Sequence, residues 1–65
     1  MRKTELQWLI DELREAPMSV RQLHRRTRRP KTAIRMALEH LLSLGVVERR
    51  RLHGGGHEWR LAHRR

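Results

Sequence analysis

The clearest pattern of apolar and polar positions lies in residues 30–45, which read PKTAIRMALEHLLSLG. At the helical angle of about 100° per residue, this segment divides into an apolar stripe and a polar side. The stripe comprises Ile34, Ala37, Leu38, Leu41 and Leu44, and the polar side comprises Thr32, Arg35, Met36, Glu39 and Ser43. Pro30 suits the first helical position, and Gly45 suits the left-handed residue that ends a helix. The pattern predicts a helix of about four turns, with one face in the core and the other free to meet a partner.

An earlier helix is predicted from apolar residues spaced i, i+3, i+4 and i+7, which are Leu6, Leu9, Ile10 and Leu13. Thr4 is expected as its N-cap, and Pro17 is expected to end it. Trp8 falls on the opposite side, among the acidic residues Glu5, Asp11, Glu12 and Glu15. An exposed Trp8 would contact a protein partner or a second copy, and the alternative is that a neighbouring loop covers it.

Two helix-start signals occur together before the third helix. Ser19 and Gln22 fit a capping box, and Met18 and Leu23 fit the hydrophobic staple around it. They predict a short helix of about two turns that ends near Thr27. A tight connector then leads into the third helix, which gives a helix-turn-helix arrangement.

The C-terminal third is predicted to form a β-hairpin. Residues 46–52 and 58–62 alternate in polarity, and three glycines at 54–56 make a flexible turn between them. A two-stranded ribbon is marginal by itself, so its apolar residues are expected to pack on the helices. These residues are Val47, Trp59 and Leu61. Residues 63–65 are expected to be a basic tail.

The positive charge of the chain is distributed unevenly along the sequence. The chain of 65 residues has a net charge of +9. Residues 1–16 carry three bases and four acids, whereas residues 17–65 carry thirteen bases and three acids. Fourteen of the sixteen bases are Arg, which makes bidentate contacts with phosphate and guanine. A basic region of this density attracts polyanions, whereas a merely solubilising surface needs neither this charge nor this preference for Arg.

Helix, helix, turn, helix and hairpin together resemble the winged helix-turn-helix family over roughly residues 4–62. The resemblance rests on residues 19–27, residues 30–45 and the passage 44–49 into a glycine-tipped wing. It implies one domain over residues 1–65, mainly α-helical with a two-stranded wing. In DNA-binding members the third helix enters the major groove, and the wing lies along the backbone or the minor groove. The resemblance therefore implies DNA contacts at Arg28, Arg29, Lys31, Thr32, Arg35, Met36, Arg49, Arg50, Arg51, Gly54, Gly55 and Gly56.

Some of these residues can be given more specific roles. Arg35, one turn into the third helix, is expected to read guanine, and Glu39 would either pair with Arg35 or accept from a cytosine amine. Alternation along the strand puts Arg49 and Arg51 on one face of the wing and Arg50 on the other. Arg49 is expected to lay its stem over the wing's tryptophan, which leaves Arg50 as the freer phosphate contact.

Catalysis and metal binding find little support in the sequence. It has no convincing grouping of serine, histidine and acid, no phosphate-binding glycine loop and no paired carboxylates. It has no cysteine, and His53 and His57 beside the glycine turn lack a third ligand for a metal. We therefore expect no enzymatic activity, no cofactor and no metal.

The expected function is sequence-reading binding of double-stranded DNA, by a small transcriptional regulator or a mobile-element architectural factor. One alternative is a protein-interaction module or adaptor that uses the acidic face around Trp8, through which a weak homodimer would also form. RNA binding is another alternative, although a chain without Tyr or Phe has few stacking platforms for single strands. With no apolar run of about 20 residues and no signal peptide, we expect no membrane association and a cytoplasmic location, on the nucleoid in a bacterium or archaeon.

Overall fold

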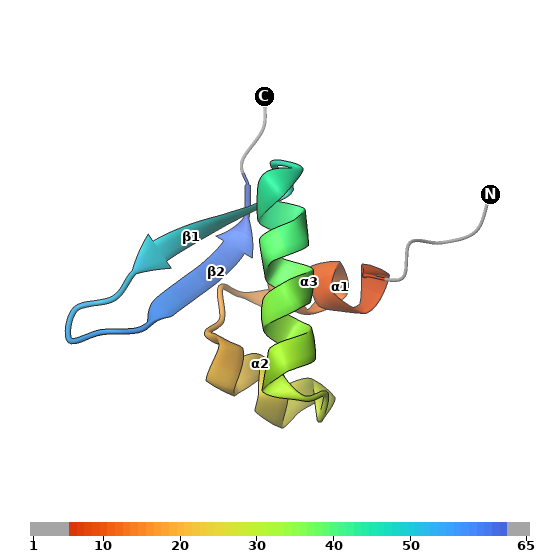
Figure 1. The fold of residues 1–65 in the computed structure, drawn as a ribbon, viewed down its shortest axis with the longest axis horizontal. Coiled ribbons are helices and arrows are strands. Elements are labelled where there is room, and N and C mark those ends of the chain that lie inside the picture. Colours follow the sequence, from red (N-terminus) through yellow and green to blue (C-terminus); the bar gives the residue numbers. More distant parts are fainter. Residues whose placement is uncertain (1–5, 63–65) are drawn as a thin grey trace.

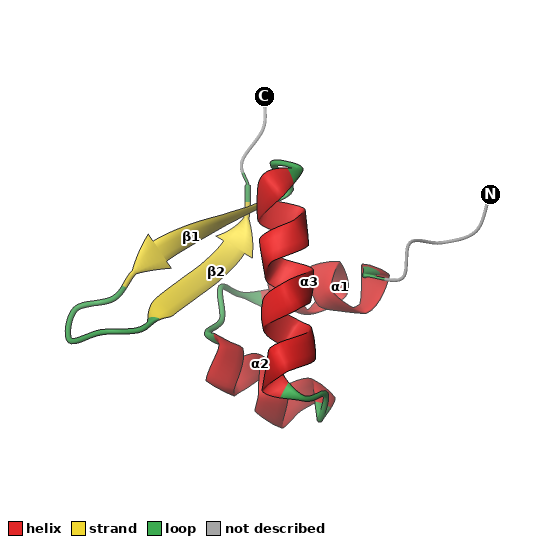
Figure 2. Ribbon diagram, in the orientation of Figure 1, coloured by secondary structure: helices red, strands yellow, loops and turns green. Residues whose placement is uncertain are grey.

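The computed structural model describes residues 6–62 as three helices followed by an antiparallel hairpin (Figure 1; Figure 2). The elements are, in chain order, α1 (Gln7–Glu15), α2 (Val20–Thr27), α3 (Lys31–Ser43), β1 (Val47–Arg51) and β2 (His57–Leu61). This confirms the predicted fold class, a mainly helical winged helix-turn-helix layout with a two-stranded wing. The expected N-cap Thr4 and the basic tail 63–65 lie outside the described residues.

The longest element is α3, with 13 residues, and the hairpin projects away from it on one side (Figure 1). α1 begins at Gln7, with Leu6 at its N-cap position, and ends at Glu15, two residues before Pro17. A membrane span needs about 20 apolar residues. None of the helices within residues 6–62 reaches the length and apolar content required to cross a membrane.

One apolar cluster holds the helices and the hairpin together. Its buried members are Leu9, Leu13, Met18, Leu23, Ile34, Ala37, Leu38, Leu41, Val47 and Trp59. Leu61 is partly buried against this cluster, so all three wing residues expected in the core contribute to it. Leu44 was wrongly expected there. It is 57% exposed because it is the residue that caps the end of α3, where it lines an open hollow beside Leu6.

The starts of α2 and α3 differ in how they are capped. In the predicted capping box, the Gln22 N–H donates to Ser19 Oγ at 3.2 Å, and the Ser19 N–H donates to Gln22 Oε1 at 2.9 Å. Pro30 was expected as the first residue of α3 but is its N-cap, because its ψ of 142° keeps it outside the helix. Its carbonyl accepts the N–H of Ile34 at 3.0 Å, so the helix begins at Lys31.

Gly45 ends α3 as predicted, in the left-handed conformation with φ 77°. Its N–H donates to the carbonyl of Leu42 at 3.0 Å, and the N–H of Val46 donates to that of Leu41 at 2.9 Å. These are the paired bonds of a Schellman motif, which satisfies carbonyls at the end of a helix. The turn passes directly into β1.

A third strand-like segment joins the hairpin to the helices, which the sequence did not predict. Met18, between α1 and α2, pairs with Trp59 of β2 in an antiparallel bridge. The Met18 N–H donates to the Trp59 carbonyl at 2.9 Å, and the Trp59 N–H donates to the Met18 carbonyl at 2.8 Å. Both side chains are buried in the core. The bridge satisfies backbone groups on one edge of a ribbon that would be marginal alone.

Candidate nucleic-acid interface

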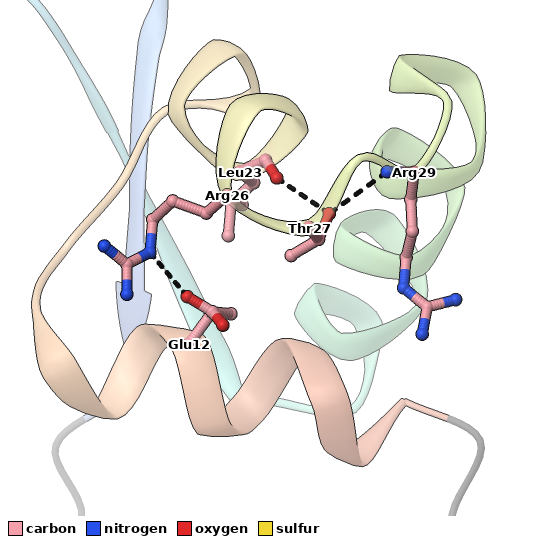
Figure 3. Close-up of polar contacts among 5 residues, drawn as sticks. All are labelled: Glu12, Leu23, Arg26, Thr27 and Arg29. Carbon is pink, nitrogen blue, oxygen red and sulfur yellow. Dashed lines mark hydrogen bonds and ion pairs between the residues drawn. The ribbon is translucent and has the colours of Figure 1, made fainter.

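The turn between α2 and α3 is fixed by side-chain hydrogen bonds (Figure 3). Thr27 Oγ1 donates to the carbonyl of Leu23 at 2.7 Å and accepts the N–H of Arg29 at 3.3 Å. His24 Nδ1–H donates to the carbonyl of Arg29 at 2.7 Å. Arg28 takes the left-handed conformation, with φ 62°, and its N–H donates to the carbonyl of His24 at 2.8 Å. The angle at which α3 leaves α2 is therefore set by these residues.

Arg29 was expected at the DNA, and the structure places it against α1. Its guanidinium carbon lies 4.0 Å from the centroid of the Trp8 ring, a cation–π arrangement. Trp8 is partly buried and packs on the core, so of the two alternatives for this ring, exposure to a partner or cover by a neighbouring loop, the second is confirmed. The residue that covers it comes from the turn, 21 positions along the chain, so helical phase alone did not reveal the contact.

Arg26 and Glu12 join α2 to α1 (Figure 3). Arg26 Nε donates to Glu12 Oε1 at 2.6 Å. The hydrogen bond to this carboxylate, and then its negative charge, raise the pKa of Arg26 above its ordinary value. Arg26 therefore belongs to the scaffold of the site.

The exposed side of α3 carries the residues that the sequence assigned to the DNA groove. Lys31, Thr32, Arg35, Met36 and Glu39 are all exposed. Met36 has 73% of its surface in contact with solvent. Within residues 6–62, Arg35 has no ion pair or hydrogen-bond partner for its side chain, so its guanidinium is available to a ligand.

Arg49 links the wing to α3. Its guanidinium carbon lies 5.7 Å from the ring centroid of Trp59, as its predicted position over this ring requires. Its Nη1 lies 3.8 Å from Glu39 Oε2. The expected pair of Glu39 with Arg35 is not formed, because Glu39 pairs with Arg49 of the wing. The alternative, a contact of Glu39 with cytosine, stays a prediction.

The two faces of the wing carry different charges. On the outer face, Glu48 lies opposite Arg60 and Arg50 lies opposite Glu58. Arg60 Nε donates to Glu48 Oε1 at 3.2 Å, and Arg50 Nη2 lies 3.9 Å from Glu58 Oε1. The outer face therefore balances two cations with two anions.

The inner face of the wing carries Arg49 and Arg51 opposite Trp59 and His57. The predicted alternation of the three wing arginines is therefore confirmed. Arg51 is exposed and, unlike Arg50, has no carboxylate within 4.0 Å among the described residues. The structure thus favours Arg51 over Arg50 as the freer cation of the wing, and contact of either one with DNA stays a prediction.

A groove of about 480 Å³ separates the inner face of the wing from α2 and α3. Three arginines from different elements line it, Arg21 of α2, Arg35 of α3 and Arg49 of β1. Among the described lining residues, Glu39 supplies the acidic group. Arg21 was missed in the sequence because its closeness to the wing depends on tertiary packing, and no local signal marks it.

Arg28 lies at a different place from this groove. Together with His24 and Arg25 it lines a second hollow, of about 440 Å³, at the C-terminal end of α2. Cations are favourable at this end of a helix because they face its partial negative charge. The structure therefore has two separate basic clusters, one in the groove with Arg35 and Arg49 and one at the turn with Arg28.

The tip of the wing is a turn of three exposed glycines. Gly54, Gly55 and Gly56 have φ values of 87°, 108° and 81°, which L side chains rarely adopt. The Leu52 N–H donates to the carbonyl of Gly56 at 3.1 Å, which closes the turn. A ligand can approach this backbone closely because no side chain shields it.

The described residues hold no group of three or more histidines or acids placed to bind a metal ion. Comparisons of the chain with protein-family models, curated proteins and solved structures found no match.

Proposed function

We propose that this chain is a sequence-reading protein for double-stranded DNA, with α3 in the major groove and the inner face of the wing along the phosphate backbone. The observation that carries the proposal is an excess of cations over acids on one side of the molecule. Three arginines, Arg21, Arg35 and Arg49, line one groove, in which Glu39 pairs with Arg49. Arg51 extends the same face of the wing. The outer face of the wing is balanced, so the charge distribution gives the molecule a preferred side for a polyanion.

The shape of α3 supports duplex DNA as the polyanion. The major groove of B-DNA is about 12 Å wide and admits an α-helix. α3 is exposed along one side and begins with Lys31, so a cation and free backbone N–H groups stand together at its N-terminus. Arg35, one turn further, is free of ion pairs within residues 6–62 and is the proposed guanine reader.

The winged helix-turn-helix layout supports the same placement, because DNA-binding members of that family use the third helix and the wing in this way. We propose membership of that family, and a role as a small transcriptional regulator or mobile-element architectural factor. Such a protein would act in the cytoplasm, on the nucleoid of a bacterium or archaeon. The partial cover of Trp8 by Arg29 weighs against α1 as the main binding surface.

The test is a titration of labelled duplex DNA, duplex RNA and single strands at several salt concentrations. For duplex DNA we expect a log–log slope of magnitude about 4–8, corresponding to about five to nine neutralised phosphates. The control is the variant Arg14→Ala. It removes one positive charge from the exposed surface of α1, away from the proposed interface, and should leave the slope of the parent protein unaltered. A slope near zero would contradict the proposal, and tighter binding of duplex RNA would favour the RNA alternative.

A further inference from the structure

The exposed side of α3 has an apolar flank beside its cations. Among the described residues, the large hydrophobic side chains left exposed are Met36, at 73%, and Leu44, at 57%. Met36 and Ala33, one turn apart, line a shallow and mainly apolar hollow of about 610 Å³ that extends along α3 to Leu44. A single exposed hydrophobic residue is ordinary. Met36 differs from such a residue because it follows Arg35, the proposed base-reading residue, directly in the chain.

Helical geometry ties Met36 to the proposed base-reading face. At about 100° per residue, Met36 points about 40° from Thr32, and Arg35 lies on the other side of Thr32. All three side chains are exposed. A helix that brings Arg35 and Thr32 to the base edges therefore also brings Met36 to them. Leu44 lies eight residues later, about 12 Å further along the axis, beyond the half of the helix that carries Lys31 and Arg35.

Charge identifies what Met36 would meet. Lys31 and Arg35 stand on the same exposed half of α3, and their charge favours a polyanion on this surface. The major-groove edge of B-DNA offers one apolar group, the C5-methyl of thymine, and 5-methylcytosine presents the same group. Methionine suits such a contact because its thioether is flexible and polarisable.

We propose that Met36, supported by Ala33, forms a binding site for the C5-methyl group of a pyrimidine next to the base pair read by Arg35. This inference rests on the proposed function. It adds that the preferred sequence holds a methylated pyrimidine at a fixed offset from a guanine. The methyl group, rather than the base as a whole, is the recognised feature.

The test uses the preferred duplex from a randomised-library selection, with each thymine replaced in turn by deoxyuridine. Burial of one methyl group corresponds to about a fourfold change in affinity, so one replacement should weaken binding about fourfold. At that position, 5-methylcytosine should bind about fourfold more tightly than cytosine, each paired with guanine. Met36→Gln should abolish both differences, and circular dichroism should show an unchanged fold because the side chain is exposed.

Leu44→Gln is the matched control. It removes the other large exposed apolar side chain that lines the same hollow and should leave the difference between thymine and uracil intact. Salt-dependent DNA binding without any thymine–uracil difference would overturn the methyl site and leave the proposed function standing. Absence of salt-dependent binding to DNA would overturn both. If Met36→Gln and Leu44→Gln instead dissociate an oligomer in sedimentation and leave the base preference unchanged, the hollow is a protein interface and the methyl site is wrong.

Discussion

Arg49→Ala should destabilise the fold, because Arg49 is held between the wing and α3. Its guanidinium stands 5.7 Å from the Trp59 ring and 3.8 Å from Glu39, and the side chain is 43% exposed. A cation–π contact at a partly exposed site contributes about 0.5–1 kcal/mol. Both side chains of the Arg49–Glu39 ion pair are exposed, so the pair contributes at most about 0.5 kcal/mol to stability. With the stem that covers the ring, the expected loss is about 1–2 kcal/mol.

That loss is large for a chain of this size. A domain of 65 residues has a free energy of unfolding of about 3–10 kcal/mol. Each kcal/mol lowers the melting temperature of a small domain by about 4–8 °C, so Arg49→Ala should melt about 5–15 °C lower. The assay is thermal and urea unfolding followed by circular dichroism at 222 nm, which reports the three helices.

Two comparison variants separate the contributions. Arg50→Ala removes an arginine side chain from the neighbouring position. Arg50 is 66% exposed and its ion pair with Glu58 is long, at 3.9 Å, so this variant should lower the free energy of unfolding by less than about 0.5 kcal/mol. Glu39→Gln should cost a few tenths of a kcal/mol in the parent protein and nothing in the Arg49→Ala background. Equal melting temperatures for Arg49→Ala and Arg50→Ala would refute the reasoning, because they would show that Arg49 supports no packing.

Three further changes separate DNA contacts from scaffold. Arg35→Ala should flatten the sequence preference at one position of the selected site and weaken specific binding by about 1–3 kcal/mol, measured with a randomised duplex library; an unchanged preferred site would rule out Arg35 as the reader. Arg51→Ala should lower the salt slope for duplex DNA by about one, whereas Arg50→Ala, on the balanced face of the wing, should lower it by less than half as much; the reverse order would return the phosphate contact to Arg50. Arg28→Gly should stabilise the fold by about 0.5–1 kcal/mol, since Arg28 has φ 62°, and should still weaken DNA binding; a lower melting temperature would show that the side chain of Arg28 supports the turn.

The elements that the sequence predicted well are those specified by neighbouring residues. The stripe of α3, the capping box at Ser19 and the left-handed Gly45 each depend on spacings of a few positions. All three hold in the structure, except that the stripe ends at Leu41 and leaves Leu44 exposed. Pro30 shows the limit of such reasoning. It marks the start of the helix, yet a local signal fixes a helix boundary only to within one or two residues, and the sequence placed this boundary one residue too early.

The contacts missed by the sequence join residues far apart in the chain. Met18 pairs with Trp59, Arg26 with Glu12 and Arg29 with Trp8. Each pair depends on how whole elements pack, which no local pattern encodes. The same limit applies to the site. Sequence periodicity identified the exposed side of α3, whereas the closeness of Arg21 and the pairing of Glu39 with Arg49 required the tertiary structure.

The most direct test of the central claim, that α3 and the inner face of the wing form the DNA interface, is to follow backbone amide signals by NMR during titration with the selected duplex. We expect the largest shifts in two segments, residues 31–36 at the start of α3 and residues 49–57 in the wing, with α1 little affected. The indole N–H of Trp8 provides an internal control, because Trp8 belongs to α1 and its ring lies under Arg29. Shifts concentrated in α1 and at Trp8, with α3 and the wing unperturbed, would contradict the account.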